Sequence, residues 1–280
     1  MISNKYKILD KINSGNFGMV YKGENMKTRE KVAIKIIHKK DEIVFKNECL
    51  IYKAIGRLSD FAKLKWISIT PDYFVIVLSL LGESIQCFKQ PQNRLDELSL
   101  KHIASNIFRK IAKLHENGIL HRDIKTNNFV KSLDFVKGLD SVKSLDSVKS
   151  LDSKNDHNIY LIDFSFSTFI VDEYGDHKPN KGIQNIIGSK YFCSLHVHDR
   201  QTPARRDDLE SACYVVNDLI NGNKWFGLTN EAEIIPYKKQ FSKSIITILP
   251  WLIPLYQHIR QLSYEETIDI ETICNYIYTT

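Results

Sequence analysis

The stretch His121-Arg122-Asp123-Ile124-Lys125-Thr126-Asn127-Asn128 decides how the rest of this chain is interpreted. Its polar side chains Asp123, Lys125 and Asn128 directly follow the apolar residues 118–120. An aspartate can accept the proton of an incoming hydroxyl, a lysine can neutralise a moving phosphoryl group, and an asparagine can hold a metal ion. A polar turn that closes the preceding helix is the alternative. The Lys and Asn at these offsets favour chemistry over that turn.

An amphipathic helix is expected immediately before this stretch, over residues 98–117. Its apolar residues recur at spacings of three and four, and Gly118 is well suited to end it. The apolar residues are Leu100, Ile103, Ile107, Ile111 and Leu114. A buried helix here would hold the following residues rigidly, as catalysis by positioning requires.

A second acidic residue, Asp163, follows further along the chain. It ends the short apolar run 159–162, which we expect to be a strand, and is followed by Phe164 and Ser165. A carboxylate in such a place can be the main ligand of an Mg²⁺ ion that bridges phosphates. An aspartate that only caps a turn is the alternative, and Asp123 earlier in the chain makes it less attractive.

A glycine-bearing turn lies near the N-terminus, between strands expected around residues 6–9 and 20–22. The turn reads Ile12-Asn13-Ser14-Gly15-Asn16-Phe17-Gly18-Met19-Val20. Glycines let backbone N–H groups approach phosphate oxygens without obstruction from a Cβ. By itself, this pattern is equally compatible with a plain hairpin.

Lys35 interrupts the apolar run 32–37, and a lysine on a buried strand is costly unless it meets an anion. The alternative is a surface lysine on an alternating strand. Residues 41–55 are then expected to form a helix, in which Glu48 is the best candidate to pair with Lys35. A solvated helical glutamate is the competing interpretation.

A hinge between two lobes is expected after two further strands, at residues 61–66 and 73–81. The apolar second strand leads into a break at residues 81–84. At such a hinge the backbone of Ser79 to Leu81 would face an adenine ring, with Leu78 behind it.

A six-residue repeat separates the two acidic stretches and reads KSLDFV, KGLDSV, KSLDSV and KSLDSK, ending at Lys154. A hexapeptide β-helix is one reading, but four copies are few and glycines are not consistent. We expect instead a low-complexity surface insertion over about residues 131–155, which a fold tolerates because loop-closure entropy grows slowly with length.

The remaining chain is expected to be a loop over residues 167–188, followed by helices. Residues 205–220 form the first of these helices, with Asp207 and Asp208 placed as caps near its start. Further helices are expected at residues 241–259 and 271–278.

The composition is that of a soluble globular protein. The 280 residues are 43% hydrophobic and 26% charged, with a net charge of +6 that suits anionic ligands without implying nucleic acid. The five cysteines are scattered, as expected of reduced thiols in a cytoplasmic or nuclear setting. The sequence shows neither a signal peptide nor an apolar run long enough to span a bilayer, so a membrane role is not expected.

These residues together resemble a eukaryotic-type protein kinase over nearly the whole chain. More narrowly, they resemble the casein kinase 1 group, which includes the vaccinia-related kinases. Residues 188–198 resemble that group's G-T-x-x-Y/F-x-S-I-x-x-H segment, and residues 205–211 are similar to its R-R-D-D-L-E-S. The departures are Asn13 for the first glycine of G-x-G-x-x-G-x-V, Ser165 for the glycine of D-F-G, and the repeat.

The resemblance implies an α+β, bilobal protein-kinase-like fold in a single domain over residues 1–280. A small, mainly-β N-lobe would occupy about residues 1–80, and a larger, mainly-α C-lobe about residues 83–280.

The resemblance also implies an ATP-dependent serine/threonine protein kinase that requires Mg²⁺. Asp123 would orient and deprotonate the substrate hydroxyl while Lys125 neutralises the γ-phosphoryl group. Asn128 and Asp163 would hold Mg²⁺, and Lys35 would bind the α- and β-phosphates. The remaining nucleotide-binding residues would be Ile12, Asn13, Ser14, Gly15, Asn16, Phe17, Gly18, Met19, Val20, Ala33, Glu48, Leu78, Ser79 and Leu81.

The expected partners are ATP and protein substrates, with acidic substrates as one option. Membrane binding and direct nucleic-acid binding are not expected, and the chain is expected to be a monomer. Two alternatives remain open: a pseudokinase that acts as a binding scaffold, suggested by Asn13 and Ser165, and a small-molecule kinase of similar fold.

Overall fold

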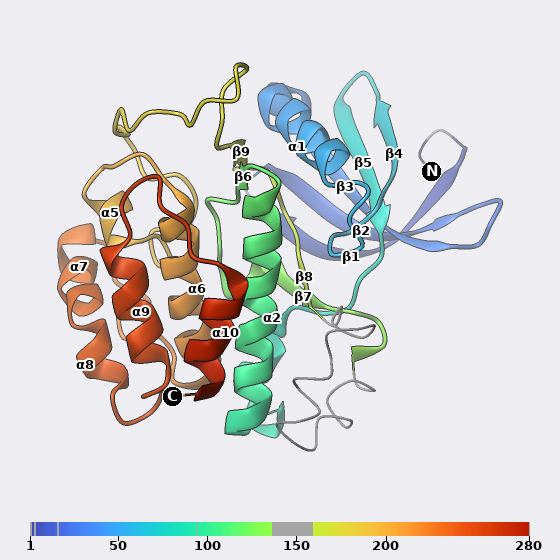
Figure 1. Ribbon diagram of the computed structural model, residues 1–280. Coiled ribbons are helices and arrows are strands. Elements are labelled where there is room, and N and C mark those ends of the chain that lie inside the picture. Colours follow the sequence, from blue (N-terminus) through green and yellow to red (C-terminus); the bar gives the residue numbers. More distant parts are fainter. Residues whose placement is uncertain (1, 3, 16, 94, 136–158, 280) are drawn as a thin grey trace.

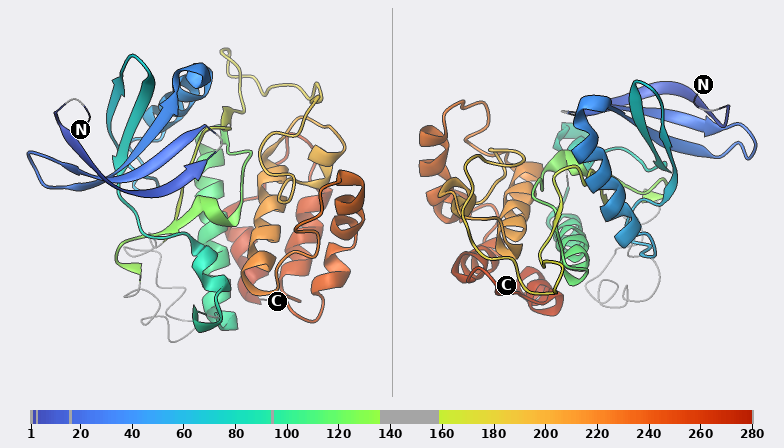
Figure 2. Two further views of the ribbon diagram at one scale, coloured as in Figure 1. Left: turned by 180° about the vertical axis from the view of Figure 1, so that it is seen from behind. Right: turned by 90° about the horizontal axis from the view of Figure 1, so that it is seen from above.

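The computed structural model describes residues 2, 4–15, 17–93, 95–135 and 159–279, and it has two lobes (Figure 1). One lobe is a β-sheet with a single long helix beside it, and the other is built mainly from helices. Figure 2 shows the same division from behind and from above. The expected α+β, bilobal fold is confirmed.

The N-lobe contains a five-stranded antiparallel sheet in the order β1-β2-β3-β5-β4. Its strands are β1 Tyr6–Gly15, β2 Gly18–Asn25, β3 Lys31–His38, β4 Leu64–Ile69 and β5 Tyr73–Ser79. The fourth strand begins three residues later than expected, because Phe61 instead forms a bridge with Leu161 of the other lobe.

Helix α1, Glu42–Ala54, packs against β3 and β5 on one face of the sheet (Figure 2). Side chains on a strand alternate between faces, so β3 sends Val32 and Ile34 into one apolar cluster and Ile37 into the core shared with α1. By the same alternation, Lys35 shares the face of Ile37 and points toward the helix.

The C-lobe surrounds α2, Glu97–Glu116, which confirms the amphipathic helix expected there. Asp96 caps it by accepting a 2.8 Å hydrogen bond from the Ser99 N–H. Helix α2 packs against α6 and α10. The other helices are α5 Leu195–His198, α6 Arg205–Ile220, α7 Glu231–Lys239, α8 Phe241–Ile245, α9 Leu252–Gln261 and α10 Ile270–Thr279.

The single helix expected over residues 241–259 is wrong, because the chain breaks between α8 and α9 at a segment that contains Pro250. Proline lacks the N–H that a helix interior needs, whereas Pro254 is tolerated in the first turn of α9. Helix α7 was not expected. Only Ile234 and Lys238 of α7 are buried, so its sequence has little apolar periodicity.

Four short strands flank the stretch 121–128, which the sequence predicted to be catalytic, and the segment around Asp163. They are β6 Ile119–Leu120, β7 Phe129–Lys131, β8 Ile159–Leu161 and β9 Thr168–Phe169. Strands β7 and β8 pair antiparallel, and the six-residue repeat begins at Lys131, the last residue of β7. The insertion expected over about residues 131–155 lies mostly outside the described residues, which stop at Phe135 and resume at Ile159. Strand β9 pairs with β6, so the segment 167–188 is not entirely loop as expected.

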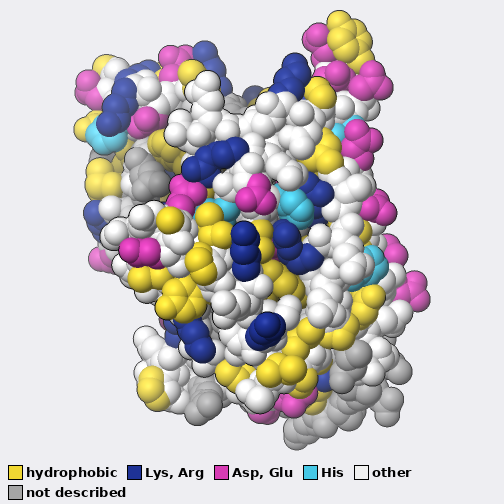
Figure 3. Space-filling model, turned by 90° about the vertical axis from the view of Figure 1, so that its left-hand side faces the viewer, with side chains coloured by type: hydrophobic (Ala, Val, Ile, Leu, Met, Phe, Trp, Pro, Cys, Tyr) yellow, Lys and Arg dark blue, Asp and Glu magenta, His cyan; other side chains and the backbone are white. Residues whose placement is uncertain are grey.

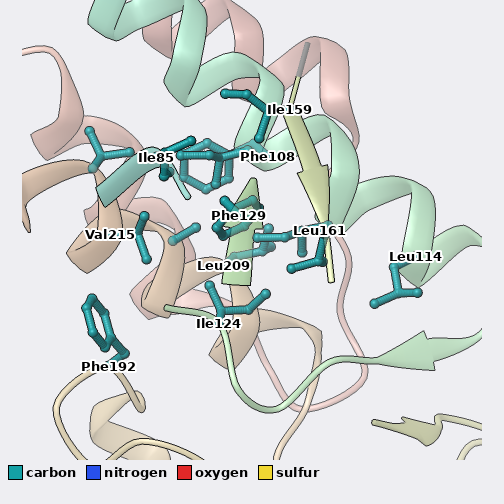
Figure 4. Close-up of a cluster of buried hydrophobic side chains, with 14 of the residues drawn as sticks. Ile85, Phe108, Leu114, Ile124, Phe129, Ile159, Leu161, Phe192, Leu209 and Val215 are labelled. Atoms are coloured by element: carbon teal, nitrogen blue, oxygen red, sulfur yellow. The ribbon is translucent and has the colours of Figure 1, made fainter. Parts of the chain in front are cut away.

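Buried side chains from several elements meet beneath the catalytic stretch (Figure 4). Phe129 of β7 and Leu161 of β8 lie in one cluster with Phe108 of α2 and Leu209 of α6. Ile124, between Asp123 and Lys125 in sequence, is 2% exposed in this cluster. Burial of such a side chain stabilises the fold by about 1.5–3 kcal/mol and fixes the backbone that carries its polar neighbours.

Short 3-10 turns occupy Lys39–Asp41, Ile85–Lys89, Pro91–Asn93 and Thr126–Asn128. Within the described ranges, no helix combines the length and apolar character needed to cross a bilayer.

Candidate active site

Lys35 and Glu48 form a buried ion pair between β3 and α1, as the sequence predicted. The Lys35 Nζ lies 2.8 Å from each carboxylate oxygen of Glu48, whose side chain is fully buried. Burial raises the pKa of Glu48, and Lys35 offsets this only in part. The alternative interpretation of Glu48 as a solvated residue is therefore wrong.

Asp163 and Ser165 join this pair from the segment that follows β8. The Lys35 Nζ donates to Asp163 Oδ1 at 2.7 Å and to Ser165 Oγ at 2.8 Å. The Ser165 hydroxyl also lies 2.6 Å from Asp163 Oδ1 and 3.1 Å from Glu48 Oε2. Three segments far apart in sequence thus meet at one ammonium group.

The charged groups of this cluster shift one another's pKa values. Burial alone would lower the pKa of Lys35, but Asp163 and Glu48 outweigh it, so the pKa rises above its ordinary value. Burial would raise the pKa of Asp163, but Lys35 outweighs it and holds that pKa well below the ordinary range. Lys35 is therefore a cation and Asp163 an anion at neutral pH.

Asp123 is held on both of its carboxylate oxygens. Its Oδ2 accepts from Lys125 Nζ at 2.6 Å and from Asn128 Nδ2 at 3.2 Å, and its Oδ1 accepts from the Ser189 N–H at 3.0 Å. Asn128 Nδ2 also donates to the Asp123 carbonyl at 2.8 Å. The three residues of the opening motif therefore form one hydrogen-bonded unit, with Asp123 only 3% exposed.

Direct hydrogen bonds connect this unit to the segment that carries Asp163. His121 Nε2 lies 3.1 Å from the Ile162 carbonyl oxygen, and the Ile162 N–H donates to the Asn128 carbonyl at 2.9 Å. The His121 ring also packs edge-on against Phe164, with 5.5 Å between ring centroids. The two stretches of the predicted site consequently have a fixed relative position.

Two residues of this site adopt a left-handed backbone conformation that is unfavourable for non-glycine residues. Arg122 has φ 64° and Asp163 has φ 66°. Such conformations cost about 1–3 kcal/mol and persist where surrounding contacts enforce them. For Arg122 the contacts include its N–H to Asp208 Oδ1 at 2.9 Å and its Nε to the Phe166 carbonyl at 2.6 Å.

Asp208 was expected to cap helix α6, and this expectation is wrong. Its Oδ2 accepts from the His121 N–H at 2.8 Å and lies 3.0 Å from His115 Nε2, so it anchors the catalytic stretch instead. Asp207 does cap the helix, by accepting from the Ala204 N–H at 2.7 Å. The sequence did contain one sign that Asp208 has another role: two adjacent aspartates stand at the start of this helix, and one is sufficient to cap it.

The two glycines of the N-terminal turn are needed for different reasons. A Cβ on Gly18 would lie 1.9 Å from the Ile36 carbonyl oxygen, so the packing of β2 on β3 requires glycine there. Among the described residues other than its chain neighbours, the atom nearest to a Cβ on Gly15 would be the Gly18 carbonyl oxygen at 4.0 Å, and the φ of Gly15 is not in the left-handed region. Packing against these residues therefore does not explain Gly15, and a glycine there leaves its backbone open to close approach by a ligand.

The other residues predicted to bind nucleotide lie on the strands around Lys35. Val20 is the β2 partner of Lys35, and Ala33 is paired with Leu78 of β5. The Ser79 N–H donates to the Lys63 carbonyl at 2.9 Å, so a contribution of Ser79 to an adenine would have to come from its carbonyl oxygen. No hydrogen bond within the described residues involves the backbone of Leu81.

The tip of the turn is held partly by its own contacts. Asn13 Oδ1 accepts from the Ser14 N–H at 2.8 Å, which supports the turn where the first glycine is replaced. Phe17 packs edge-on against Phe166, with 5.1 Å between ring centroids, so the turn reaches the segment after Asp163. Ile12 is 53% exposed, and Met19 Sδ accepts from the Tyr21 hydroxyl. Asn16 lies outside the described residues.

Comparison with known families agrees with this geometry. The model of the protein kinase domain matches residues 6–274. The chain belongs to the protein kinase family. This protein kinase is 27% identical over 282 residues to casein kinase I homolog 3 of Schizosaccharomyces pombe. The match covers 95% of the chain but 60% of that relative's length, and it confirms the resemblance to the casein kinase 1 group.

The donor set of this kinase fits a magnesium ion that is bound together with phosphates. Among the described residues, no cluster of three or more His, Cys, Asp and Glu side chains could form an all-protein metal cage. Mg²⁺ is usually held by one or two carboxylates together with water and phosphate oxygens, so Asp163 and the amide oxygen of Asn128 suffice. Both hydrogen bonds that the Asn128 side chain makes within the described residues use Nδ2, so Oδ1 is the atom that would be available to a metal ion.

Proposed function

We propose that this protein kinase transfers the γ-phosphate of ATP to serine and threonine hydroxyls of proteins, as a member of the casein kinase 1 group. The observation that carries the proposal is that Lys35 contacts Asp163, that Asp123 contacts Asn128, and that the hydrogen bond from the Ile162 N–H to the Asn128 carbonyl ties the two pairs together. These residues come from β3, from the loop after β6 and from the end of β8.

Asp123 has the contacts that a general base for a hydroxyl needs. The Ser189 N–H and the Lys125 ammonium fix the direction of its carboxylate. Lys125 is 28% exposed at its side chain, so it remains accessible to a phosphoryl group that it can neutralise. In phosphoryl transfer, such positioning and charge neutralisation provide most of the rate enhancement.

Lys35 would bind the phosphates that precede the transferred group, and the open backbone at Gly15 would approach the same triphosphate. Asn128 and Asp163 would hold Mg²⁺, which when bound neutralises charge on the phosphates. Glu48 keeps the Lys35 ammonium in place, because both of its carboxylate oxygens lie 2.8 Å from the Lys35 Nζ.

The charge of the protein supports acidic substrates. The net charge is +6, and Figure 3 shows several Lys and Arg side chains near the middle of the face seen from the α7 side, with a few acidic side chains beside them and others toward the edges. Positive potential on such a face attracts acidic peptides and accelerates their association. We place the enzyme in the cytoplasm or nucleus as a monomer.

A peptide array with ATP labelled at the γ-phosphate tests the proposal. Each serine peptide is paired with threonine, tyrosine and alanine versions in acidic and basic contexts, and Asp123→Ala serves as the inactive control. Label on serine and threonine, but not tyrosine, with a preference for acidic flanks, is the expected result. No label on any peptide or protein, from a protein that still binds nucleotide, would contradict the proposal.

The scaffold alternative lacks support from the site. Ser165, one of the two departures that suggested it, adds hydrogen bonds to Lys35 and Asp163 instead of displacing either residue, and Asn13, the other, supports its own turn through the Ser14 N–H. A chain without phosphotransfer would have no physical need for this arrangement.

A further inference from the structure

Lys238 is a fully buried lysine on α7, outside the site described above. Its Nζ donates to the carbonyl oxygens of Lys190, at 3.0 Å, and of Cys193. A third partner is His198 Nε2, 3.0 Å away. Within the described residues Lys238 forms no ion pair with a carboxylate, so its ammonium is directed almost entirely at backbone and ring acceptors of the segment 188–198.

The three acceptors match the three N–H donors of a protonated ammonium. The ring centroids of Tyr214 and Trp225 lie 5.0 and 5.7 Å from the Lys238 Nζ, so the remaining surroundings of the ammonium are aromatic. A fully buried cation in such surroundings destabilises the fold unless its contacts contribute more free energy than the hydration that it has lost. Packing alone would be better satisfied by a methionine.

The segment 188–198, which Lys238 contacts, also contacts the proposed general base, Asp123. Ser189, adjacent to Lys190, donates its N–H to Asp123 Oδ1 at 3.0 Å, and the Cys193 N–H donates back to the Ser189 carbonyl at 2.9 Å. A Cβ on Gly188 would lie 2.3 Å from the Arg122 carbonyl oxygen, so the segment lies directly against the catalytic stretch.

Trp225 fixes the same segment at one more point, because its Nε1 donates to the Tyr191 carbonyl at 2.7 Å. The carbonyls of residues 190, 191 and 193 are therefore all held by side chains from the C-lobe helices and their connections. A displacement of this turn would move the Ser189 N–H away from Asp123. Displacements of about 1 Å at a catalytic group can reduce rates about 100-fold.

We propose that Lys238 is a positioning residue for phosphotransfer, which holds the turn 188–193 so that the Ser189 N–H orients the Asp123 carboxylate. The inference rests on the proposed kinase function. Lys238 does not touch the reacting groups, and its effect reaches Asp123 only through the backbone of this turn.

The protonation state of Lys238 provides an independent signature. Burial lowers the pKa of Lys238 to about 8, and the nearby groups Cys193, Glu210 and Glu231 raise it only in part. His198 and the Tyr214 ring also lie against the Lys238 nitrogen. Burial lowers the pKa of His198 and raises that of Tyr214, so both are neutral at pH 7–9. A neutral amine has two donors for three acceptors, and the turn loses one of its hydrogen bonds as pH rises through about 8.

Lys238→Met removes the ammonium and keeps the length of the side chain, and Lys239→Met is the matched control because the neighbouring Lys239 is exposed. For Lys238→Met, we expect kcat/KM for peptide to fall about 10- to 100-fold, while the dissociation constant for nucleotide stays within about twofold. Lys239→Met should match the wild type in both measurements. Hydrogen exchange should show loss of protection at residues 189–193 in Lys238→Met only.

The wild-type protein supplies a second test in case the variant fails to fold. Its kcat/KM for peptide should fall by up to about tenfold between pH 7 and pH 9, with loss of exchange protection at residues 189–193 over the same range after correction for intrinsic exchange. Lys238→Met should lack both pH dependences.

The outcomes separate this inference from the kinase proposal. Wild-type kinetics and wild-type protection in Lys238→Met would overturn the role of Lys238 and leave the kinase proposal intact. If the wild type transfers no phosphate, the kinase proposal fails, and protection at residues 189–193 alone decides whether Lys238 holds the turn. Equal protection in the wild type at pH 7 and pH 9 would count against it.

Discussion

Ser165 should stabilise the nucleotide-free protein through its hydroxyl, and Ser165→Ala tests this directly. Ser165 is 7% exposed, and its hydroxyl has three hydrogen-bond partners: Lys35, Asp163 and Glu48. It has a single proton, so it can accept from Lys35 and donate to one carboxylate at a time. Two of the three contacts are therefore present at any moment.

The expected loss follows from those two contacts. A hydrogen bond to a charged group contributes about 1.5–3 kcal/mol, which gives an upper bound of about 3–6 kcal/mol. Lys35 keeps its contacts with Glu48 and Asp163 when the hydroxyl is removed, so no charge is left unpaired, and the desolvation cost of the hydroxyl disappears as well. We expect a net loss of about 1–2 kcal/mol.

Thermal unfolding followed by circular dichroism measures this loss. Unfolding entropy of about 2.1 cal/mol/K per residue, over 280 residues, makes 1 kcal/mol equivalent to about 2 °C, so Tm should fall by about 2–4 °C. The control is Ser242→Ala, in the short helix α8 of the C-lobe. A Tm for Ser165→Ala that equals the wild-type value, with Ser242→Ala also unchanged, would refute the reasoning.

Three further substitutions test other parts of the site. Asp123→Ala should reduce phosphotransfer about 10²- to 10⁴-fold, the range for a lost general base, with nucleotide affinity nearly unchanged; normal turnover would exclude Asp123 as the base. Gly188→Ala should lower Tm by several degrees, because φ is +81° and the new Cβ would lie 2.3 Å from the Arg122 carbonyl; an unchanged urea midpoint would be inconsistent with this close packing. Asp163→Asn should make the free energy of unfolding less dependent on pH in the acid range. The pKa of Asp163 is depressed, mainly by Lys35 acting against burial, so its contribution is present above the unfolded pKa of about 4 and is lost as pH falls further. Equal slopes of urea midpoint against pH for Asp163→Asn and the wild type, between pH 5 and pH 3, would contradict this assignment.

Motifs with local chemical meaning could be interpreted without a structure. Lys35 in an apolar strand indicated an anionic partner, and Glu48 was the best candidate in the helix that follows, with a solvated glutamate as the competing interpretation. The structure decided between them, because both Glu48 oxygens lie 2.8 Å from the Lys35 Nζ. The amphipathic pattern of α2 and the apolar strand before Asp163 were equally legible, because one side of each element is buried and the spacing of apolar residues records which side.

Interactions between distant segments could not be inferred in this way. Asp208 resembles a helix cap in sequence, yet its partner His121 lies 87 positions away, and no local pattern indicates which backbone group a carboxylate will meet. In the sequence Ser165 was only a departure from D-F-G that suggested a pseudokinase, whereas the fold gives its hydroxyl three charged partners. In α7 the apolar periodicity was too weak to predict the helix.

The sequence by itself determined which groups are available for phosphotransfer and the elements on which most of them lie, because strand and helix periodicity and short motifs are local properties of a chain. Only the tertiary structure decided how those groups are held. The contacts that orient Asp123, through Ser189 and the turn fixed by Lys238, join segments whose proximity depends on the packing of the whole C-lobe. Hydrogen bonds have short range, so the sequence of either partner alone carries no record of them.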